Sequence, residues 1–375
     1  MKIKDICTSV TDGSHNPPQG IEKSEYMMLS SKNIFDDEIT FDEPRFLSQK
    51  DFEREHKRTK IAVGDVLLTI VGTVGRTAVV DEDMPAFALQ RSVAVLHPKN
   101  DVCLPRFLMY ALRGKRTYIE NRAKGVAQKG IYLKEVSDID IYIPDISNQE
   151  IIINKLDKVN AIIKLRQEEL LALDDLIKAR FVELFDGKYP EDTLLNLCNI
   201  VDYRGKTPEK VEHGLPFITA KNVKMHHMTL EPREYISKET YDKVMVRGFP
   251  KEGDVVFTTE APLGNVCRIP HFDTEFYIGQ RIVTMQTDAL NPTYLEYALS
   301  DEEFVRKYMG KSSGSTVTGI RVRLLQQLTI PVPARTLQDE FSTFVNQVDK
   351  SKVAVQKALD ETQMLFDSLM QEYFR

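Results

Sequence analysis

The stretch Leu-Ser-Ser-Lys-Asn-Ile at residues 29–34 recurs as Ile-Thr-Ala-Lys-Asn-Val at residues 218–223, which lie 189 positions further along the chain. Further matches at the same offset occur in the same order along the two halves of the chain. They include Gly64-Asp65-Val66 with Gly253-Asp254-Val255, Gly75 with Gly264, Gly125 and Gly130 with Gly314 and Gly319, Pro144 with Pro333, and Gln149 with Gln338. The chain is therefore one unit used twice.

The first part of each unit, residues 1–148 and 187–337, predicts a compact α+β domain. Short β-branched runs alternate there with Gly and Pro. A helical stretch is predicted at about 105–122 and again at about 292–309, each with Pro on its N-terminal side, where it is tolerated. Strands are predicted at 66–71, 93–96, 139–143, 255–259, 282–285 and 328–332.

The second part of each unit, residues 149–186 and 338–375, contains no Gly and no Pro and predicts a long helix. Apolar residues recur there every seven positions, which is typical of a coiled-coil seam. They are Leu156, Ile163, Leu170, Ile177 and Leu184 in the first helix, and Phe341, Val348, Val355 and Leu369 in the second, where Lys352 and Thr362 interrupt the pattern.

Each predicted helix would be roughly 55 Å long at 1.5 Å per residue, which is longer than a small domain is wide. The domain between the two helices lets the chain return, so we expect an antiparallel pair. This arrangement predicts a pseudo-twofold axis, with the two domains separated by a stiff spacer.

Composition narrows the class of protein. The chain of 375 residues is 42% hydrophobic and has no apolar run long enough to span a membrane, and its start lacks the pattern of a secretory signal, so we expect a cytoplasmic location. Its four cysteines lie far apart, which indicates neither a zinc site nor a disulfide framework. The net charge is −6, but the two helical segments carry −5 of it and the domains are close to neutral.

Short strings that resemble catalytic motifs lack the context their chemistry needs. Asn16-Pro17-Pro18-Gln19 has Gln where the base-stacking ring of an amino-methyltransferase must stand. Gly310-Lys311-Ser312 ends like a phosphate-binding loop but follows a predicted helix instead of a strand. His226-His227 has no acidic or cysteine ligand at fixed spacing, and we interpret both as surface histidines. The sequence thus predicts no catalytic and no metal-ligating residues.

Over its whole length the chain resembles the specificity (S) subunit of type I restriction-modification systems. The resemblance rests on Gly-Asp-Val-Leu-Leu at 64–68 with Gly72-Thr-Val-Gly75, on their repeats at 253–257 and 263–264, and on Gln90-Arg91 with Gln280-Arg281. Arg204-Gly-Lys-Thr-Pro208 is similar to the Gly-x-Thr-Pro string that opens such domains. The first domain departs from this pattern with Asp12-Gly-Ser-His-Asn-Pro17.

The resemblance implies that each α+β domain is a target recognition domain that reads one half of a split sequence in double-stranded DNA. It implies that the helices set the spacing between the halves and that the chain itself is not an enzyme and holds no cofactor. Two methyltransferase (M) subunits with S-adenosylmethionine, and two restriction (R) subunits with ATP and Mg²⁺, are the partners that it implies. No membrane partner is expected.

Side chains with paired donors and acceptors, chiefly Arg, Lys, Asn and Gln, read bases in the major groove, and we expect them in loops. For Gln-Arg, a structural role is the stronger alternative, because both units keep the pair although they would read different bases. The Gly-bounded loops at 124–130 and 311–319 differ in sequence, as reading different bases would require. The candidate DNA-binding residues are Lys32, Asn33, Gln90, Arg91, Lys124, Gln128 and Lys129 in the first unit, and Arg204, Lys206, Lys221, Asn222, Gln280, Arg281, Lys311, Ser313, Ser315, Thr316 and Thr318 in the second.

Two other functions stay open on the sequence. The paired domains could form a protein-binding scaffold that never meets DNA, which salt-dependent DNA binding would exclude. The chain could also be the recognition subunit of a related bifunctional restriction system, and the identity of the neighbouring genes would distinguish this alternative.

Overall fold

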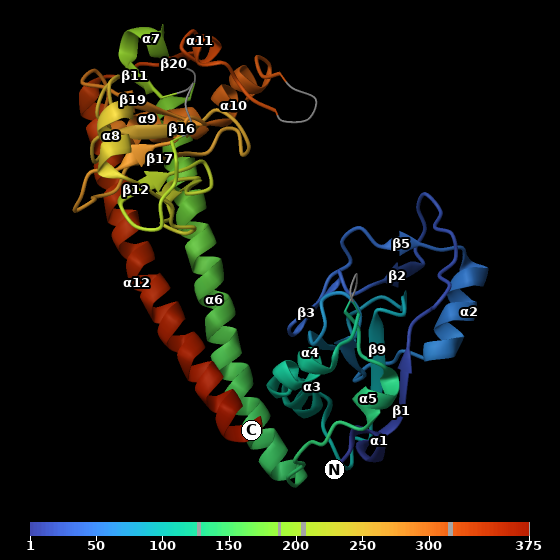
Figure 1. Cartoon of the computed structure of the whole chain (residues 1–375). Helices are drawn as coiled ribbons and strands as arrows, with labels where there is room; N and C mark the ends of the chain where they lie inside the picture. The colour runs from blue at the N-terminus through green and yellow to red at the C-terminus, as the bar shows by residue number, and fades with distance from the viewer. Residues whose placement is uncertain (126–128, 187–188, 204–207, 314–317, 375) are drawn as a thin grey trace. The chain divides into compact units, whose positions relative to one another are not determined.

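The computed structural model describes residues 1–125, 129–186, 189–203, 208–313 and 318–374. The chain divides into two compact units, Met1–Gln167 with Lys357–Arg375, and Glu168–Gln356. Each unit contains a sheet-rich domain and part of two long helices, α6 (Ile146–Phe185) and α12 (Arg335–Phe374) (Figure 1). Each helix is 40 residues long, and they begin 189 positions apart, like the sequence repeat.

The domain of the first unit is built from two small sheets and a hairpin. The larger sheet is antiparallel with strand order β1-β9-β6-β7, and the smaller has the order β5-β2-β8, in which β2 and β8 run parallel. The strands are β1 (Cys7–Asp12), β2 (Met27–Leu29), β3 (Ile34–Phe35), β4 (Glu38–Ile39), β5 (Arg45–Phe46), β6 (Val66–Thr69), β7 (Thr77–Val79), β8 (Phe87–Leu89) and β9 (Val93–Pro98). Its helices are α1 (Ile3–Ile6), α2 (Gln49–Thr59), α3 (Pro105–Gly114), α4 (Arg116–Arg122) and α5 (Leu133–Ser137).

The second unit repeats this topology and adds a two-stranded sheet of β10 and β20. Its larger sheet has the order β11-β19-β16-β17, its smaller sheet the order β15-β12-β18 with β12 and β18 parallel, and β13 pairs with β14. The strands are β10 (Glu191–Thr193), β11 (Asn199–Asp202), β12 (Leu215–Ile218), β13 (Val223–Lys224), β14 (His227–Met228), β15 (Tyr235–Ile236), β16 (Val255–Thr258), β17 (Val266–Arg268), β18 (Tyr277–Ile278), β19 (Ile282–Gln286) and β20 (Thr329–Pro331). Its helices are α7 (Leu194–Leu197), α8 (Lys238–Val244), α9 (Pro292–Ser300), α10 (Glu302–Met309) and α11 (Val322–Leu325). The predicted α+β class and the duplication are confirmed.

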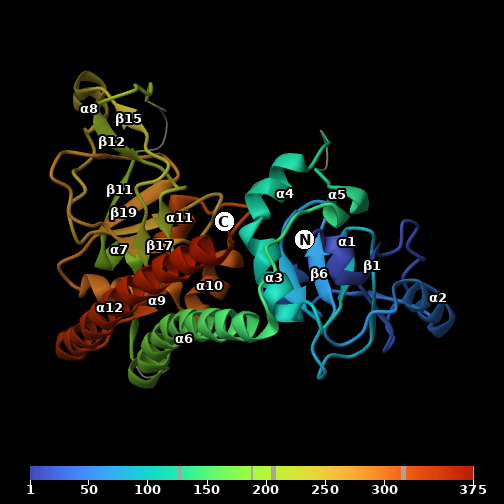
Figure 2. The same cartoon turned by 90° about the horizontal axis from the view of Figure 1, so that it is seen from below.

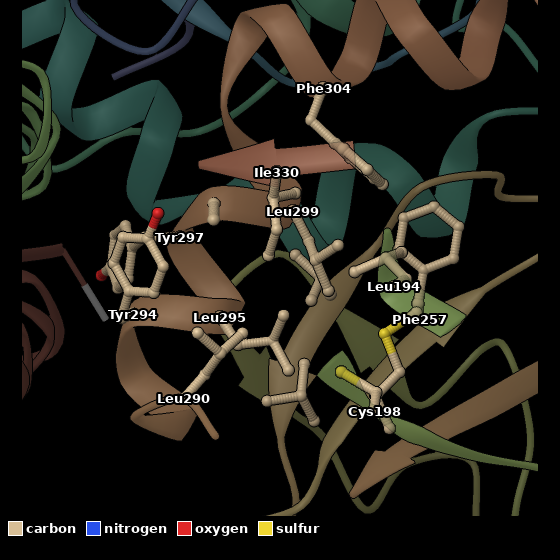
Figure 3. Close-up of a cluster of buried hydrophobic side chains, with 14 of the residues drawn as sticks. Leu194, Cys198, Phe257, Leu290, Tyr294, Leu295, Tyr297, Leu299, Phe304 and Ile330 are labelled. Carbon is tan, nitrogen blue, oxygen red and sulfur yellow. The ribbon is translucent and has the colours of Figure 1, made fainter. Parts of the chain in front are cut away.

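A helix covers the larger sheet of each domain and joins it to the long helices. In the first unit α3 packs on β6 and β7 (Figure 2). In the second unit the equivalent α9 contributes Tyr294, Leu295 and Leu299 to a core that also contains Phe257 of the sheet (Figure 3). The same core includes Ile177 and other side chains of α6 and α12, so each domain and its part of the helix pair share one apolar core.

Two local predictions were wrong. The helical stretches at 105–122 and 292–309 are each two helices, because the chain leaves helical geometry at Lys115 and Asp301. The run at 139–143 forms no strand, although its equivalent contains β20, which pairs with β10. In the first unit the run meets only the first residues of the chain, where the N–H of Ile141 donates to the carbonyl of Met1 over 2.9 Å, and that partner is too short for a ladder.

The long helices run antiparallel, as predicted. In the first unit Lys155 Nζ donates to the hydroxyl of Tyr373 over 3.1 Å, and the seam residues Leu156 and Ile163 are buried in one cluster with Phe366. In the second unit, ion pairs join Asp174 to Lys352 over 2.5 Å and Arg180 to Glu340 over 2.8 Å, so positions rise along α6 as they fall along α12. Lys352, which interrupts the heptad, therefore forms an ion pair across the helix pair.

A buried glutamine fastens the start of each long helix to its domain. The side-chain oxygen of Gln149 accepts the N–H of Leu104 over 2.8 Å, and its amide nitrogen donates to the carbonyls of Val102 and Pro144 over 2.9 Å. Gln338 repeats this contact, since its side-chain oxygen accepts the N–H of Asn291 over 2.8 Å. Because a buried amide without partners is costly, these contacts explain why Gln is the fourth residue of both helices.

The repeated Gly-Asp-Val string is a turn that leads into a central strand. Gly64 and Gly253 have φ of 86° and 84°, a region that favours glycine. The carboxylate of Asp65 accepts the N–H of Ala62 over 2.7 Å, and Asp254 repeats this contact three residues back along the chain. The string is therefore structural in both units.

The four cysteines are buried, so we expect the folded chain to resist thiol reagents. Burial raises the pKa of Cys7, Cys103, Cys198 and Cys267 to about 12. At about pH 8 this lowers the reactive thiolate fraction about a thousandfold relative to an ordinary thiol. Titration with a chromogenic disulfide should detect no fast thiol in the native chain and all four in concentrated guanidinium chloride. A fast native thiol would contradict the burial of that cysteine.

No helix among the described residues is long and apolar enough to cross a membrane.

Candidate nucleic-acid interface

The parallel strand pair of each smaller sheet brings several candidate residues to one edge. Strands β2 and β8 pair in register, so the residues after their carboxyl ends, Lys32 and Gln90-Arg91, lie at the same edge. The N–H of Gln90 donates to the carbonyl of Leu29 over 2.9 Å, which fixes this junction. In the second unit β12 and β18 pair in the same way and place Lys221 and Gln280-Arg281 together.

The Gly-bounded loops are closed at their base by a reciprocal pair of backbone hydrogen bonds. Lys124 and Gly130 exchange N–H to carbonyl bonds of 2.8 and 2.9 Å, and Ser313 and Gly319 exchange bonds of 3.0 and 3.1 Å. The residues of each loop base are therefore held in a hairpin, whatever the residues between them are.

Backbone hydrogen bonds connect the two groups of candidates. In the first unit the N–H of Ile131 donates to the carbonyl of Ile70, whose own N–H donates to Ser92, next to Arg91. In the second unit Ile320 donates to Thr259, which donates to Arg281. Each unit thus brings the Gln-Arg pair beside the base of its Gly-bounded loop, although about 35 residues of sequence separate them.

The cationic and hydroxyl side chains at this edge reach solvent. Gln90 and Gln280 are half-buried, and Arg281 lies 3.5 Å from the carboxylate of Glu260 with about half of its side chain exposed (56%). Such groups can donate to phosphates and to acceptor atoms of bases. The exposed candidates are Lys32, Arg91, Lys124 and Lys129 in the first unit, and Lys221, Arg281, Lys311, Ser313 and Thr318 in the second.

The two candidate asparagines have structural positions instead. The Asn33 side chain accepts the N–H of Ser30 over 3.1 Å and donates to the carbonyl of Asp42 over 2.8 Å, and only 5% of the residue is exposed. Asn222 is buried in the same way and holds its own loop. The geometry therefore argues against base contacts by either residue. Both units have asparagine after the lysine because its side chain forms the hydrogen bonds that hold the loop.

Five candidates lie outside the residues that the structure describes. They are Gln128, Arg204, Lys206, Ser315 and Thr316.

A pocket of about 350 Å³ in the second unit adds residues that the sequence analysis missed. It is lined by the candidates Lys221, Gln280 and Arg281 and by Lys210 and Phe217, among others. The Lys210 ammonium lies 5.9 Å from the centre of the Phe217 ring, and it also pairs with Glu234 over 2.7 Å. The signal in the sequence was the position of Lys210, two residues after the Lys-Thr-Pro string.

The rejected catalytic motifs have ordinary structural contacts. In the string that ends like a phosphate-binding loop, the hydroxyl of Ser312 donates to the carbonyl of Met309 over 2.7 Å and so closes the end of α10. Among the residues that the structure describes, no group of three or more His, Cys, Asp or Glu side chains is placed to hold a metal ion.

Comparison with known proteins finds similarity to type I restriction specificity proteins. Residues 1–174 match the family model of the type I restriction modification DNA specificity domain. The EcoBI specificity subunit of Escherichia coli is 26% identical over 189 residues, which are 49% of this chain and 38% of that relative. The MjaVIII specificity subunit of Methanocaldococcus jannaschii is 22% identical over 307 residues, which are 72% of this chain and 71% of the relative. The match to the E. coli protein thus covers less than half of its length.

Solved structures share the fold. The S subunit of a type I restriction-modification system from M. genitalium aligns with a TM-score of 0.57 at 14% identity, over 100% of this chain and 95% of that one. A chain from a study of complex assembly and conformational transition of the type I R-M system aligns with a TM-score of 0.58 at 18% identity, over 100% and 97%. Residues 1–174 thus match a type I restriction modification DNA specificity domain, and the chain is similar in sequence and in fold to type I restriction enzyme specificity subunits.

Proposed function

We propose that this chain directs a type I restriction-modification complex to a bipartite target in double-stranded DNA. Residues 1–148 and 187–337 are the two recognition domains, and each reads one half of the target. The helical segments 149–186 and 338–375 set the distance between the halves and dock two methyltransferase subunits. S-adenosylmethionine, ATP and Mg²⁺ belong to the methyltransferase subunits and to two restriction subunits.

One observation carries this proposal: each unit presents exposed donors on the same hydrogen-bonded framework with different loop sequences. The loop base and the Gln-Arg pair are joined in the same way in both units. The loop between the bounding glycines reads Val-Ala-Gln-Lys in one unit and Ser-Thr-Val-Thr in the other. Two domains that read different half-sites require the same backbone framework with different hydrogen-bonding side chains.

The surface of the long helices supports a docking role. Large apolar side chains are exposed along them although the seam between the helices is already filled. Exposed apolar residues that form a contiguous patch mark sites of protein contact. They are Ile162, Leu165, Leu171, Leu176 and Val182 on α6, and Val353, Met364 and Leu365 on α12.

The proposal is tested by measuring DNA binding of the chain assembled with the methyltransferase encoded beside it. We expect sequence-specific binding whose log K falls linearly with log salt, because Lys and Arg contacts release counterions. Arg281→Ala should weaken binding by about 1–3 kcal/mol, or at least about fivefold. The matched control is Arg233→Ala, since Arg233 is as exposed and is paired with Glu231, but its side chain is not among those that line the pocket.

Two results would contradict the proposal. Stable association with the methyltransferase but no DNA binding at any salt concentration would indicate a protein scaffold. Specific binding that requires one fused methyltransferase-nuclease partner would place the chain in a bifunctional system.

A further inference from the structure

The hairpin β3-β4 carries a residue in an unusual backbone conformation, and so does its repeat. Asp37 has φ of 60° and His226, 189 positions later, has φ of 63°. Few residues other than glycine adopt this left-handed conformation, although Asp, Asn and His are enriched in it. The conformation is thus kept in both units although the side chain is not.

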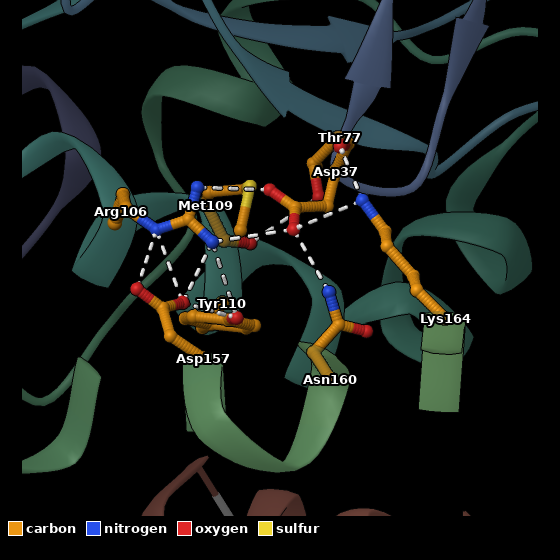
Figure 4. Close-up of polar contacts among 8 residues, drawn as sticks. All are labelled: Asp37, Thr77, Arg106, Met109, Tyr110, Asp157, Asn160 and Lys164. Atoms are coloured by element: carbon orange, nitrogen blue, oxygen red, sulfur yellow. Dashed lines mark hydrogen bonds and ion pairs between the residues drawn. The ribbon is translucent and has the colours of Figure 1, made fainter. Parts of the chain in front are cut away.

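In the first unit this turn is bonded to the long helix α6 (Figure 4). The carboxylate of Asp37 accepts the amide of Asn160 over 2.8 Å and lies 3.8 Å from the ammonium of Lys164. Both partners belong to α6, and only 11% of the Asp37 side chain is exposed. A direct polar contact therefore connects the recognition domain to the spacer helix.

Arg106 of α3 completes the contact from the other side. Its guanidinium donates to both oxygens of Asp37 over 3.0 and 3.2 Å and to Asp157 of α6 over 2.6 to 3.0 Å. Tyr110 also donates to Asp157, over 2.6 Å. Burial acts to lower the pKa of Arg106, but its hydrogen bonds to Asp157 and Asp37 outweigh burial and raise it, so the guanidinium stays charged. Planar bidentate pairs of this kind fix direction as well as distance.

The second unit fastens the same turn with different chemistry. His226 pairs with the buried carboxylate of Glu296 on α9 over 3.0 Å and stacks on Tyr297 with ring centres 4.2 Å apart. Arg268 bonds the same carboxylate over 2.6 Å and lies 3.8 Å from Asp349 on α12. The interpretation of His226 as a surface histidine was therefore wrong, because only 21% of its side chain is exposed.

We propose that Asp37 and Arg106 are positioning residues that set the angle of the first recognition domain on its spacer helix, and thereby the gap between half-sites that the complex accepts. This inference rests on the proposed function. The group formed by Asp37, Arg106, Asp157 and Asn160 is here named the clasp. It acts without touching DNA, because its side chains are bonded to the domain and to α6. His226 and Glu296 have the equivalent role in the second unit.

The test compares variants in the assembled complex on duplexes that carry the wild-type target with its gap unchanged, one base pair shorter or one base pair longer. Asp37→Asn removes the charge, yet asparagine tolerates the same backbone conformation. Arg106→Gln removes both bidentate pairs. Arg116→Gln is the matched control, because Arg116 bonds Asp36 of the same turn and the carbonyl of Gly75, both inside the domain.

We expect Asp37→Asn and Arg106→Gln to reduce discrimination against the altered gaps about tenfold, with no change in the preferred bases of either half-site. The control should keep wild-type discrimination, and thermal melting shows whether each variant is folded. If one clasp variant fails to fold, the other decides.

Wild-type gap discrimination in a folded clasp variant would overturn the positioning role while leaving the proposed function intact. Altered base preference would also overturn it, since it would indicate DNA contact. If the wild-type complex binds no specific DNA, the proposed function fails and this inference fails with it.

Discussion

Phe341→Ala is expected to lower the free energy of unfolding of the second unit by about 3–5 kcal/mol, the usual cost of removing a buried ring. Phe341 lies on α12, is fully buried, and its ring centre is 5.4 Å from Phe181 and 5.5 Å from Phe185 on α6. It also meets Tyr297 of α9 edge to face at 5.3 Å. One ring therefore joins the α+β domain to both long helices of its unit, and three aromatic contacts are lost with it.

The measurement is urea unfolding followed by far-ultraviolet circular dichroism, since the chain has no tryptophan to report by fluorescence. Val353→Ala is the control on the same helix, because 71% of Val353 is exposed and its loss should change stability by less than about 0.5 kcal/mol. A Phe341→Ala variant as stable as this control would show that the domain and the helices are not held together by their shared core.

The duplication was the feature of the sequence that predicted most of the fold, because a repeat can be recognised without knowing which residues are in contact. The absence of Gly and Pro located both long helices at 149–186 and 338–375, and their observed starts at Ile146 and Arg335 keep the repeat offset of 189. The heptad predicted the partner of each helix, since a seam of buried residues must face another seam. Boundaries inside the domains were less predictable, as the interruption of helix at Lys115 shows, because the single Gly114 before it is a signal that helices also tolerate in their interior.

The candidate interface was predictable only in part, because the sequence does not show which side chains a folded loop uses for its own hydrogen bonds. Lys32 and Arg91 could be found because loops that follow parallel strands meet at one edge. Asn33 could not be separated from Lys32 by sequence, since its role depends on hydrogen bonds to Ser30 and Asp42, which belong to the folded loop. Repetition in both units therefore does not by itself distinguish a structural residue from an exposed one.

The clasp had no signal in the sequence at all. Asp37 and Arg106 are 69 positions apart, and comparison of the repeats is misleading because Asp37 corresponds to His226. The two units hold the equivalent turn with different side chains, so comparison of the repeats does not reveal the contact. Only the left-handed conformation shared by both turns reveals it.

Exchange of residues 1–148 for the equivalent domain of a relative should replace one half of the DNA target and leave the other half unchanged. The physical reason is that each unit has its own core and its own candidate DNA-binding edge, so under the proposed function the donor domain brings its own hydrogen-bond donors. Methylation of the original target should fall by at least about a thousandfold, the usual difference between specific and non-specific binding. The new target is identified by sequencing methylated sites in cells that carry the exchanged chain.

The structure also dictates how this exchange must be built. The domain meets α6 through Gln149 and through Asp157 and Asn160 of the clasp, so the donor must supply partners for these residues. The reciprocal exchange of residues 187–337 is the control and should replace only the other half. If either exchange changed both halves, the two domains would be reading DNA jointly. If neither changed the target, the bases would be read by another subunit, and the exposed donors at the strand edges would serve only to hold phosphates.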